Sequence, residues 1–389
     1  MPIKNRYAEL HAEITEWRRD FHRHPELMYE VHRTAARVAE LLREFGCDEV
    51  VEGIGRTGVI GVIKGKSDTK GKVIGLRADM DALPIEEATG LDYASETPGM
   101  MHACGHDGHT SMLLGAAKYL CETRQFDGTA IMIFQPAEEG GAGGKAMCDD
   151  GMMDRWNIQE VYGMHNMPGG PVGSFAIRPG ALLASSDEFQ ITVTGRGGHA
   201  AAPHMAVDTT LVAAQILLSL QTVVSRNIDP IKRVVLTVGT FVTDSVASNV
   251  IAHTVTMNGT VRTLDSECRE QARERVFAIA QGTAETLGAS AEVVWTPGYP
   301  VTMNTPENTE YAAEVARNIA GSDRVDDATD PIMPAEDFAY MLEERPGAYI
   351  FLGNGDTAMC HHPAYNFDDE AIPFGSSWYS GMVEARMPV

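Results

Sequence analysis

Towards both ends of the chain, short apolar runs of strand length alternate with stretches of helical periodicity. The strand patterns cover residues 58–63, 73–76, 130–134, 160–163 and 348–352, and the helical patterns cover 7–21, 30–44, 109–121, 307–319, 336–342 and 370–384. This alternation favours an α/β fold in which a mixed sheet is covered by helices. Because open α/β sheets place their ligand crevice beyond the carboxyl ends of the strands, polar residues there are candidates for one shared site.

The middle of the chain has a different pattern. Strand patterns at 189–194, 234–241, 254–260 and 292–295 are separated by helical patterns at 207–220 and 266–287. The order strand–helix–strand–strand–helix–strand is typical of a self-contained α+β open sandwich. A chain of 389 residues also exceeds one ordinary core. We therefore expect a discontinuous larger domain, residues 1–185 and 298–389, with a smaller domain, 186–297, inserted in it.

Composition excludes several classes of partner. The chain is 44% hydrophobic and 22% charged, as globular proteins are, and its net charge of −23 disfavours nucleic acid and anionic membrane surfaces. No apolar run approaches the roughly 20 residues of a membrane span. The first residues carry no apolar signal-peptide core, and the six cysteines show no disulfide-like spacing. We therefore expect a cytoplasmic protein.

The segment from Met101 to His109 is rich in metal ligands. It reads Met-His-Ala-Cys-Gly-His-Asp-Gly-His and contains one cysteine and three histidines. Cys104 and His106 flank Gly105, which allows a tight turn, and thiolate and imidazole groups are typical zinc ligands. Buried thiols and core histidines are common, so this pair alone does not establish a metal site.

Further candidate ligands follow other predicted strands. Glu138 and Glu139 follow the strand at 130–134, His165 follows the strand at 160–163, and the pair His361-His362 comes after the strand at 348–352. Adjacent glutamates usually mark a solvated turn. At a strand end that faces a metal, however, one glutamate can bind the ion while its neighbour transfers protons.

Two aspartates end another predicted strand. Asp79 and Asp81 occur in the sequence Asp-Met-Asp-Ala-Leu-Pro. A solvated turn is the simpler interpretation. The functional interpretation is a carboxylate that orients a metal-binding histidine, a role that metal sites commonly require, and we favour it for Asp81.

The inserted segment contains a loop of small residues. Gly195-Arg-Gly-Gly-His199 continues as Ala-Ala-Ala-Pro-His204, and the glycines allow close approach of the backbone to a ligand. His199 is the candidate functional residue, although a loop histidine is more often simply exposed. Asn249 and Arg262 are weaker candidates for substrate binding.

Taken together, these motifs resemble those of peptidase family M20, subfamily D. The resemblance rests on Asp79-Met-Asp-Ala-Leu-Pro, Met101-His-Ala-Cys-Gly-His-Asp-Gly-His, Phe134-Gln-Pro-Ala-Glu-Glu-Gly, Gly163-Met-His-Asn, Gly198-His-Ala-Ala-Ala-Pro-His and His361-His-Pro-Ala-Tyr-Asn-Phe-Asp-Asp. It extends in order over essentially the whole chain. The resemblance implies a dinuclear-metal, exopeptidase-like catalytic domain and a lid domain that often mediates dimerisation, and hence a homodimer or homotetramer.

The resemblance also implies roles for individual residues. Its metal ligands correspond to Cys104 in the bridging position, His106, Glu139, His165 and His361. Members often read Leu-His-Ser-Pro or Leu-His-Thr-Pro at the last motif, which aligns His361 with the ligand and leaves Cys360 in the usual leucine position. Glu138 corresponds to the catalytic general base and acid. His199 corresponds to the lid histidine that reaches a substrate carbonyl, in its own or the partner subunit's site, helped by Asn249.

The implied activity is metal-dependent cleavage of N-acyl amino acids, hippurate-like N-benzoyl or N-acetyl compounds, to a carboxylic acid and a free amino acid. Two divalent ions, Mn²⁺, Zn²⁺, Co²⁺ or Ni²⁺, would activate the attacking water. An N-acetyl-diaminopimelate deacetylase or a dipeptidase of the same fold is the near alternative. A non-catalytic metal- or peptide-binding protein is an alternative of another class. A zinc oxidoreductase is disfavoured, because the GxGxxG match at residues 53–58 leads into a strand rather than a helix.

Overall fold

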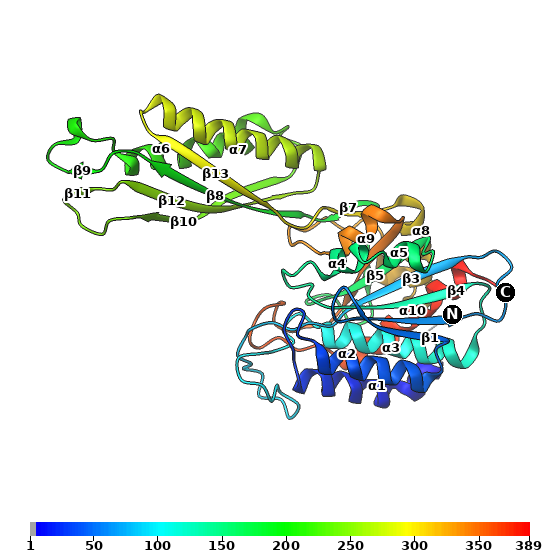
Figure 1. The fold of residues 1–389 in the computed structure, drawn as a ribbon. Coiled ribbons are helices and arrows are strands. Elements are labelled where there is room, and N and C mark those ends of the chain that lie inside the picture. The colour runs from blue at the N-terminus through cyan, green and yellow to red at the C-terminus, as the bar shows by residue number, and fades with distance from the viewer. Residues whose placement is uncertain (1–4) are drawn as a thin grey trace. The chain divides into compact units, whose positions relative to one another are not determined.

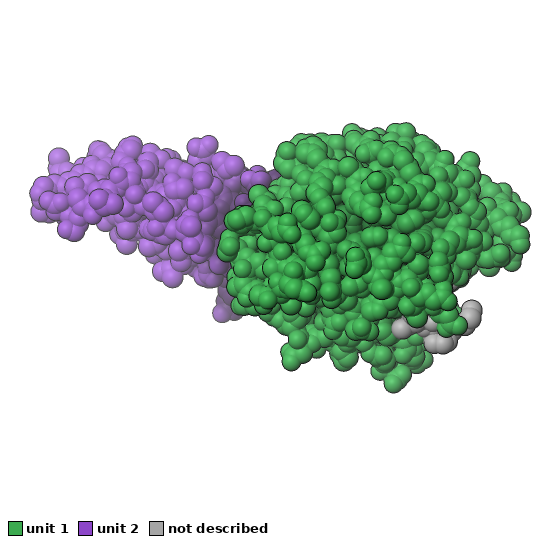
Figure 2. Space-filling view, turned by 90° about the horizontal axis from the view of Figure 1, so that it is seen from below, with its two compact units in different colours: residues 1–182, 303–330, 337–389 green, residues 183–302, 331–336 purple. Residues whose placement is uncertain are grey.

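The computed structural model describes residues 5–389, which form two compact units (Figure 2). Unit 1 comprises the chain up to Leu182 together with residues 303–330 and 337–389, and unit 2 comprises 183–302 and 331–336. Unit 2 is longer at both ends than the segment 186–297 predicted from the sequence. It also includes residues 331–336, which the sequence analysis placed in the larger domain. The reason is local pairing within unit 2, where Leu183 forms a β-bridge with Ile332 and the Ala184 N–H bonds to the Pro334 carbonyl.

Unit 1 is built on an eight-stranded sheet whose order is β1-β2-β4-β3-β5-β16-β6-β15. The central strands β4, β3, β5 and β16 are parallel to one another, and β1 and β2 add an antiparallel edge. The mixed α/β sheet expected from the sequence is therefore confirmed. The strands are β1 (Glu49–Ile54), β2 (Gly58–Lys64), β3 (Val73–Asp79), β4 (Thr129–Gln135), β5 (Glu160–Met167), β6 (Phe175–Ala176), β15 (Val325–Asp326) and β16 (Gly347–Gly353).

Helices cover both faces of this sheet (Figure 1). On one face, α3 packs against the sheet and against α1, α2 and α10, and α10 also contacts α8. The short helices α4 and α9 pack against strands β4, β5 and β16. The helices of unit 1 are α1 (Asn5–Arg23), α2 (His32–Phe45), α3 (His106–Thr123), α4 (Gly143–Asp149), α5 (Met152–Arg155), α8 (Pro306–Ala320), α9 (Phe338–Glu344) and α10 (Ile372–Arg386), with 3₁₀ turns η3 (Ser322–Arg324) and η4 (Asp369–Ala371).

Unit 2 contains a four-stranded antiparallel sheet of order β10-β12-β8-β13, with α6 and α7 packed on it and on each other (Figure 1). The core between sheet and helices is apolar and includes Ile191, Ile216, Met257 and Val276. This is the open sandwich expected from the sequence pattern. Its elements are β8 (Ser185–Thr194), β9 (Gly198–His199), η1 (Pro203–Met205), α6 (Thr209–Thr222), the π-helical turn η2 (Val223–Asn227), β10 (Val234–Thr243), β11 (Val250–Ile251), β12 (Thr254–Thr263), α7 (Ser266–Thr286) and β13 (Ser290–Pro297). The short strands β7 (Gly180–Leu183) and β14 (Thr302–Asn304) lie where the chain passes between the units.

Two predictions about local structure were wrong in detail. His165 was expected beyond its strand, but β5 continues to Met167 and pairs His165 with Phe351 of β16. Helix α3 begins at His106, three residues earlier than expected, because Gly105 adopts a left-handed φ of 88° as its N-cap residue. The GxGxxG match does form a turn between strands, as expected, since β1 ends at Ile54 and β2 begins at Gly58.

Over the described residues, the helices are all too short or too polar to cross a membrane.

Candidate metal centre

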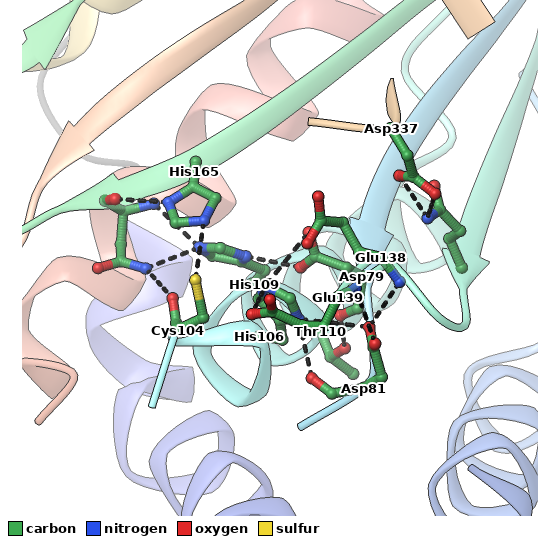
Figure 3. A network of polar contacts seen from close by, with 12 residues as sticks. Asp79, Asp81, Cys104, His106, His109, Thr110, Glu138, Glu139, His165 and Asp337 are labelled. Carbon is green, nitrogen blue, oxygen red and sulfur yellow. Dashed lines mark hydrogen bonds and ion pairs between the residues drawn. The ribbon is translucent and has the colours of Figure 1, made fainter. Parts of the chain in front are cut away.

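The carboxyl ends of the parallel strands bring the candidate ligands of unit 1 together. Strand β3 ends at Asp79 and pairs it with Gln135, the last residue of β4, so the Glu138–Glu139 turn starts beside the aspartates. His165 lies near the carboxyl end of β5. Figure 3 shows Cys104 and His165 close together, with Glu138 and Glu139 beyond His106. The convergence of side chains predicted from the strand ends is therefore present in the structure.

Gly105 makes the tight approach of Cys104 and His106 possible. A Cβ atom at this position would lie 2.3 Å from the Tyr365 hydroxyl oxygen and 2.4 Å from Asn166 Nδ2. Its left-handed φ also disfavours any other residue. Gly105 therefore allows Cys104, ahead of the helix, and His106, at the first position of α3, to face the same centre.

Two groups of potential metal ligands share the Cys104 sulfur. One consists of Cys104, His106 and His165, and the other of Cys104, Glu139 and His361; in each, the ligand atoms lie within 4.8 Å of one another. Cys104 Sγ lies 3.4 Å from His165 Nε2, and His361 Nε2 lies 3.3 Å from Glu139 Oε1. The two groups form a donor set of one thiolate, three imidazoles and one carboxylate around a common sulfur.

One buried ring nitrogen of this cluster lacks a hydrogen bond. His106 Nε2 has no hydrogen-bond partner among the described residues, and it lies 3.9 Å from Glu139 Oε1, which His361 Nε2 approaches to 3.3 Å. Buried polar atoms are otherwise almost always paired, so an unpaired imidazole nitrogen that faces a carboxylate oxygen is well suited to bind a cation. Mixed sulfur, nitrogen and oxygen donors suit zinc-like divalent ions. The residues present therefore fit a divalent metal.

The structure distinguishes His361 from His362. His361 has a left-handed φ of 68°, and its backbone N–H bonds to the Ala103 carbonyl at 2.7 Å, which holds it beside the cysteine segment. His362 instead accepts the backbone N–H of Ala364 at its Nδ1 atom, at 3.0 Å. His361 is thus the member of the pair that lies in the cluster.

Asp81 connects three parts of the cluster. Its carboxylate accepts the backbone N–H groups of Glu138, at 2.9 Å, and Glu139, at 3.1 Å. Its main-chain carbonyl accepts the Nδ1–H of His106 at 2.8 Å, which leaves Nε2 of that ring free to bind a cation. The sequence predicted that Asp81 orients a histidine. In the structure its backbone carbonyl makes the shorter contact, its Oδ1 atom lies 3.5 Å from the same ring nitrogen, and its carboxylate also holds the glutamate turn.

The sequence analysis did not identify His109 as part of the site. Its Nδ1 atom donates to Asp79 Oδ1 at 2.7 Å, and its Nε2 atom accepts the backbone N–H of Asn166 at 2.9 Å. Both ring nitrogens are therefore occupied, so His109 orients the site rather than binding metal. Its ring packs edge-on against His165, with 4.7 Å between ring centroids. The available signal was its spacing of three residues from His106, which places both on one face of a helix.

Asn166 and Arg77 form a supporting layer that the sequence analysis also missed. Asn166 Nδ2 donates to the Cys104 carbonyl at 2.6 Å, and its Oδ1 accepts from the Tyr365 hydroxyl at 2.8 Å. Fully buried Arg77 donates to Asp79 at 2.6 Å and to Asp337 at 2.9 Å. The contact from Asn166 fixes the backbone of the proposed ligand Cys104, and the contact from Arg77 fixes Asp79, which orients His109.

Charges within the cluster shift several pKa values. Burial opposes ionisation of Asp79, but Arg77 and His106 hold the pKa of Asp79 well below its usual value. Burial likewise opposes protonation of His106, but Asp79 and Asp81 raise its pKa well above the usual value. The Cys360 thiol and burial raise the pKa of Cys104. A divalent cation would reverse the shifts of His106 and Cys104, because it competes with their protons.

Within unit 2, the structure brings together His199 and Asn249. Strands β9 and β11 pair His199 with Val250, and the Asn249 carbonyl accepts the Ala200 N–H at 3.0 Å. Both residues line a hollow of about 630 Å³ together with Gly197, Gly198, Asp244, Ser245, Val250, Ile251 and His253. The predicted small-residue loop thus forms one wall of a cavity.

Arg262 lies elsewhere in unit 2. Strand β12 pairs Thr254 with Thr194, close to the small-residue loop, whereas Arg262 pairs with Ser186 at the other end of the strand. Eight residues of extended chain span roughly 26 Å. The guanidinium bonds to the hydroxyl of Thr260 and to the Val261 carbonyl. Arg262 therefore does not share the hollow with His199 and Asn249.

Comparison with known proteins agrees with this geometry. Residues 75–385 match the family model described as Peptidase family M20/M25/M40, and the chain belongs to this family. It is 42% identical to the hippurate hydrolase of Campylobacter jejuni, with 96% of each chain aligned, and 42% identical to the N-acetyl-L-cysteine deacetylase of Bacillus subtilis, with 94% of this chain and 86% of that protein aligned. A crystal structure of a dinuclear metal-binding M20 peptidase from Bacillus subtilis matches with a TM-score of 0.86 and 33% identity, over 98% of this chain and 99% of that one. The resemblance inferred from the motifs is confirmed.

Proposed function

We propose that this protein is a metal-dependent amidohydrolase that cleaves N-acyl amino acids to a carboxylic acid and a free amino acid. The observation that carries the proposal is the pair of ligand groups that share Cys104, with Glu138 beside His106 and Glu139. The hippurate hydrolase and the N-acetyl-L-cysteine deacetylase among its relatives support an N-acyl amino acid as substrate. We infer hippurate-like N-benzoyl or N-acetyl compounds as the preferred class.

We propose Cys104, His106, Glu139, His165 and His361 as the residues that would hold two divalent ions, since Cys104 is common to both ligand groups. The dinuclear metal-binding relative of known structure supports the number of ions. The donor set suits Zn²⁺, Mn²⁺, Co²⁺ or Ni²⁺. When bound, these ions would lower the pKa of a water molecule and polarise the substrate carbonyl.

We propose that Glu138 moves the proton. It is 8% exposed, and its backbone N–H is fixed by Asp81, so its position relative to the ligand Glu139 is set by the turn they share. A carboxylate held there can accept a proton from the attacking water and return it to the leaving amine nitrogen. The protonated amine is a far better leaving group than an amide anion, so one side chain serves both steps.

His199 and Asn249 are proposed to contact the substrate. Both line the hollow in unit 2, and both offer donors that suit a carbonyl oxygen or its developing negative charge. His199 accepts the Ala201 N–H at Nδ1, 3.0 Å away, which leaves its Nε2 atom to donate. Arg262 remains a weaker proposal for substrate binding, because it lies away from this hollow.

We also infer a homo-oligomer that assembles through unit 2. Helix α6 exposes Leu211 and Leu218, each 63% accessible, and the edge strand β10 exposes Val242, which is 60% accessible. Exposed apolar side chains and an uncovered sheet edge favour association with a second copy. Sedimentation of the protein at several concentrations tests this, and a monomer at all of them contradicts it.

The proposed activity is tested by stripping the protein with chelator, reloading it with Mn²⁺, Zn²⁺, Co²⁺ or Ni²⁺, and offering N-benzoyl and N-acetyl amino acids and dipeptides. Metal-restored release of the free amino acid supports the proposal, and the order of rates identifies the preferred acyl group. Faster cleavage of dipeptides would favour the dipeptidase alternative. If protein shown to hold two ions turns over none of these substrates, the proposal of an amidohydrolase that acts on these compounds is rejected.

A further inference from the structure

A second cysteine lies next to the shared sulfur of the metal centre. The Cys360 thiol donates to the main-chain carbonyl of Cys104 at 3.9 Å, so it lies beside the residue whose sulfur both ligand groups share. Cys104 is 7% exposed and Cys360 is partly exposed, so small solutes can reach the pair from the Cys360 side. The two residues are 256 positions apart in the chain, and only the fold brings them together.

The backbone keeps the two cysteines in place. The His361 N–H donates to the Ala103 carbonyl at 2.7 Å, so the residues adjacent to each cysteine are hydrogen-bonded to each other. Asn166 Nδ2 also holds the Cys104 carbonyl, at 2.6 Å. Because the flanking backbones are tied together in this way, we expect side-chain rotation to bring the two thiols to bonding distance.

Cys360 is not needed as a metal ligand. The ligand groups that contain Cys104 are completed by His106 and His165, or by Glu139 and His361, and neither contains Cys360. A thiol that lies against a metal-binding thiol without belonging to the ligand set is well placed to react with it when the ion is absent. Thiols that are held close to a partner thiol form disulfides readily after oxidation.

We propose that Cys104 and Cys360 form a reversible disulfide when the metal-free protein meets a hydroperoxide, and that this disulfide blocks metal uptake. One thiolate attacks a peroxide oxygen and becomes a sulfenic acid, and one water molecule is released when the oxidant is hydrogen peroxide. The second thiol then attacks the sulfenic sulfur, forms the S–S bond and releases a second water molecule. The two sulfurs together lose two electrons, which the peroxide accepts.

The consequence is protection of the centre. Without a neighbouring thiol, a sulfenic acid at Cys104 can be oxidised further to sulfinic acid, which dithiols do not reduce. With Cys360 beside it, the sulfur is diverted into a disulfide that dithiols reverse. The block of metal uptake rests on the proposed ligand role of Cys104, whereas disulfide formation depends only on the two thiols.

The experiment treats chelator-stripped protein with hydrogen peroxide, blocks the remaining thiols and maps linked peptides by mass spectrometry. Co²⁺ uptake, followed by thiolate-to-cobalt absorbance, is measured before oxidation, after it, and after dithiothreitol. We expect a linked peptide pair containing Cys104 and Cys360, loss of Co²⁺ uptake, and recovery of both on reduction. Oxidation of Cys104 to sulfinic acid with no link to Cys360 would overturn the proposal.

Two variants complete the test. Cys360→Ser is expected to take up Co²⁺ before oxidation. After oxidation it should lose Co²⁺ uptake, and dithiothreitol should not restore it. Cys360→Ala replaces the serine variant if that variant is poorly folded. If the parent protein loses Co²⁺ uptake irreversibly to the same extent as the variant, the proposal is contradicted. Cys121→Ser is the matched control, because Cys47 and Cys121 form the other close thiol pair, 3.6 Å apart, and its removal should change nothing in the Co²⁺ readout.

Metal-loaded protein separates this inference from the proposed function. We expect bound ions to prevent the disulfide, because a ligating thiolate is not available to peroxide. If the disulfide forms equally fast in loaded protein, the thiol pair is supported but the ligand role of Cys104 is rejected.

Discussion

The carboxylate of Asp81 accepts the backbone N–H of Glu138 at 2.9 Å. Its other oxygen accepts the N–H of Glu139 at 3.1 Å, so one buried side chain fixes both the proposed proton carrier and a proposed ligand. Burial raises the pKa of Asp81, which is fully enclosed, whereas its contacts with His106 and the glutamate turn favour the charged form. The geometry of the turn therefore depends on a residue outside the proposed ligand set.

Asp81→Asn should weaken the centre without removing any ligand. An amide has only one oxygen, so one of the two N–H groups loses its acceptor and meets an amide donor instead. Loss of such a supporting contact typically costs 10–100-fold in metal affinity or activity. Metal titration and steady-state rates measure the effect, and Asp92→Asn, at an exposed position, is the control. If metal affinity and rate in Asp81→Asn equal those of the parent, the turn that contains Glu138 and Glu139 keeps its geometry without the Asp81 carboxylate.

The adjacent glutamates should separate catalysis from metal binding. Glu138→Gln is expected to lower kcat by about 10²–10⁴-fold while both ions stay bound, since only proton transfer is lost. Glu139→Gln is expected to weaken metal binding, because it replaces a charged ligand with a neutral one. Metal content and kcat measured on both variants decide the assignment. The opposite pattern, with metal lost from the Glu138 variant, would exchange the two roles.

The adjacent histidines provide a similarly matched pair. His361 lies 3.3 Å from Glu139, whereas His362 is occupied by the N–H of Ala364. We expect His361→Asn to lower metal stoichiometry or affinity, and His362→Asn to leave both near the parent values. Metal analysis of the two variants after dialysis against a weak chelator measures this. Equal losses would mean that the loop, rather than one imidazole, supports binding.

Much of the fold follows from periodicity in the sequence. The buried strands β3, β4 and β16 contain continuous apolar runs, so they and the long helices were predicted, whereas the short elements α4, α5, β6 and β15 were not. Strand β1 was missed because it is an edge strand whose residues Glu49, Glu52 and Gly53 are exposed, which removes the apolar signal. Strand β5 was predicted too short because His165 and Asn166 interrupt its apolar run, although pairing with β16 extends it to Met167.

The site was predictable where residue type alone indicates chemistry, as it does for Cys104 and His106. It was not predictable where a role depends on contacts over long sequence separations. His109 has the same residue type as His106 and lies three positions away, yet Asp79 and Asn166 occupy both of its nitrogens. The contact between Cys104 and Cys360 likewise exists only because the fold brings the two segments together.

His22, on α1, provides a test of electrostatics at a buried residue that is not itself a proposed ligand. Its ring is buried between two carboxylates: Nδ1 lies 2.8 Å from Asp107 Oδ2, and Nε2 lies 3.3 Å from Glu87 Oε1. Burial opposes protonation, but these two hydrogen bonds raise the pKa of His22 to about 9. The ring also faces Tyr93 and His102, and Arg18 lies one turn earlier on α1, bonded to Asp107.

A folded-state pKa above the unfolded value of about 6.5 stabilises the protein at low pH and loses that effect as pH rises. The contribution of His22 should be complete below about pH 6.5 and disappear as pH passes through about 9. The shift corresponds to a loss of about 3 kcal/mol in the free energy of unfolding.

Urea unfolding of metal-free protein from pH 6 to pH 9.5 should show this decline in the parent and a flatter profile in His22→Gln. The exposed His32→Gln should follow the parent, since its side chain is 69% accessible. Parallel profiles for parent and His22→Gln would mean that the buried ring is neutral across this range.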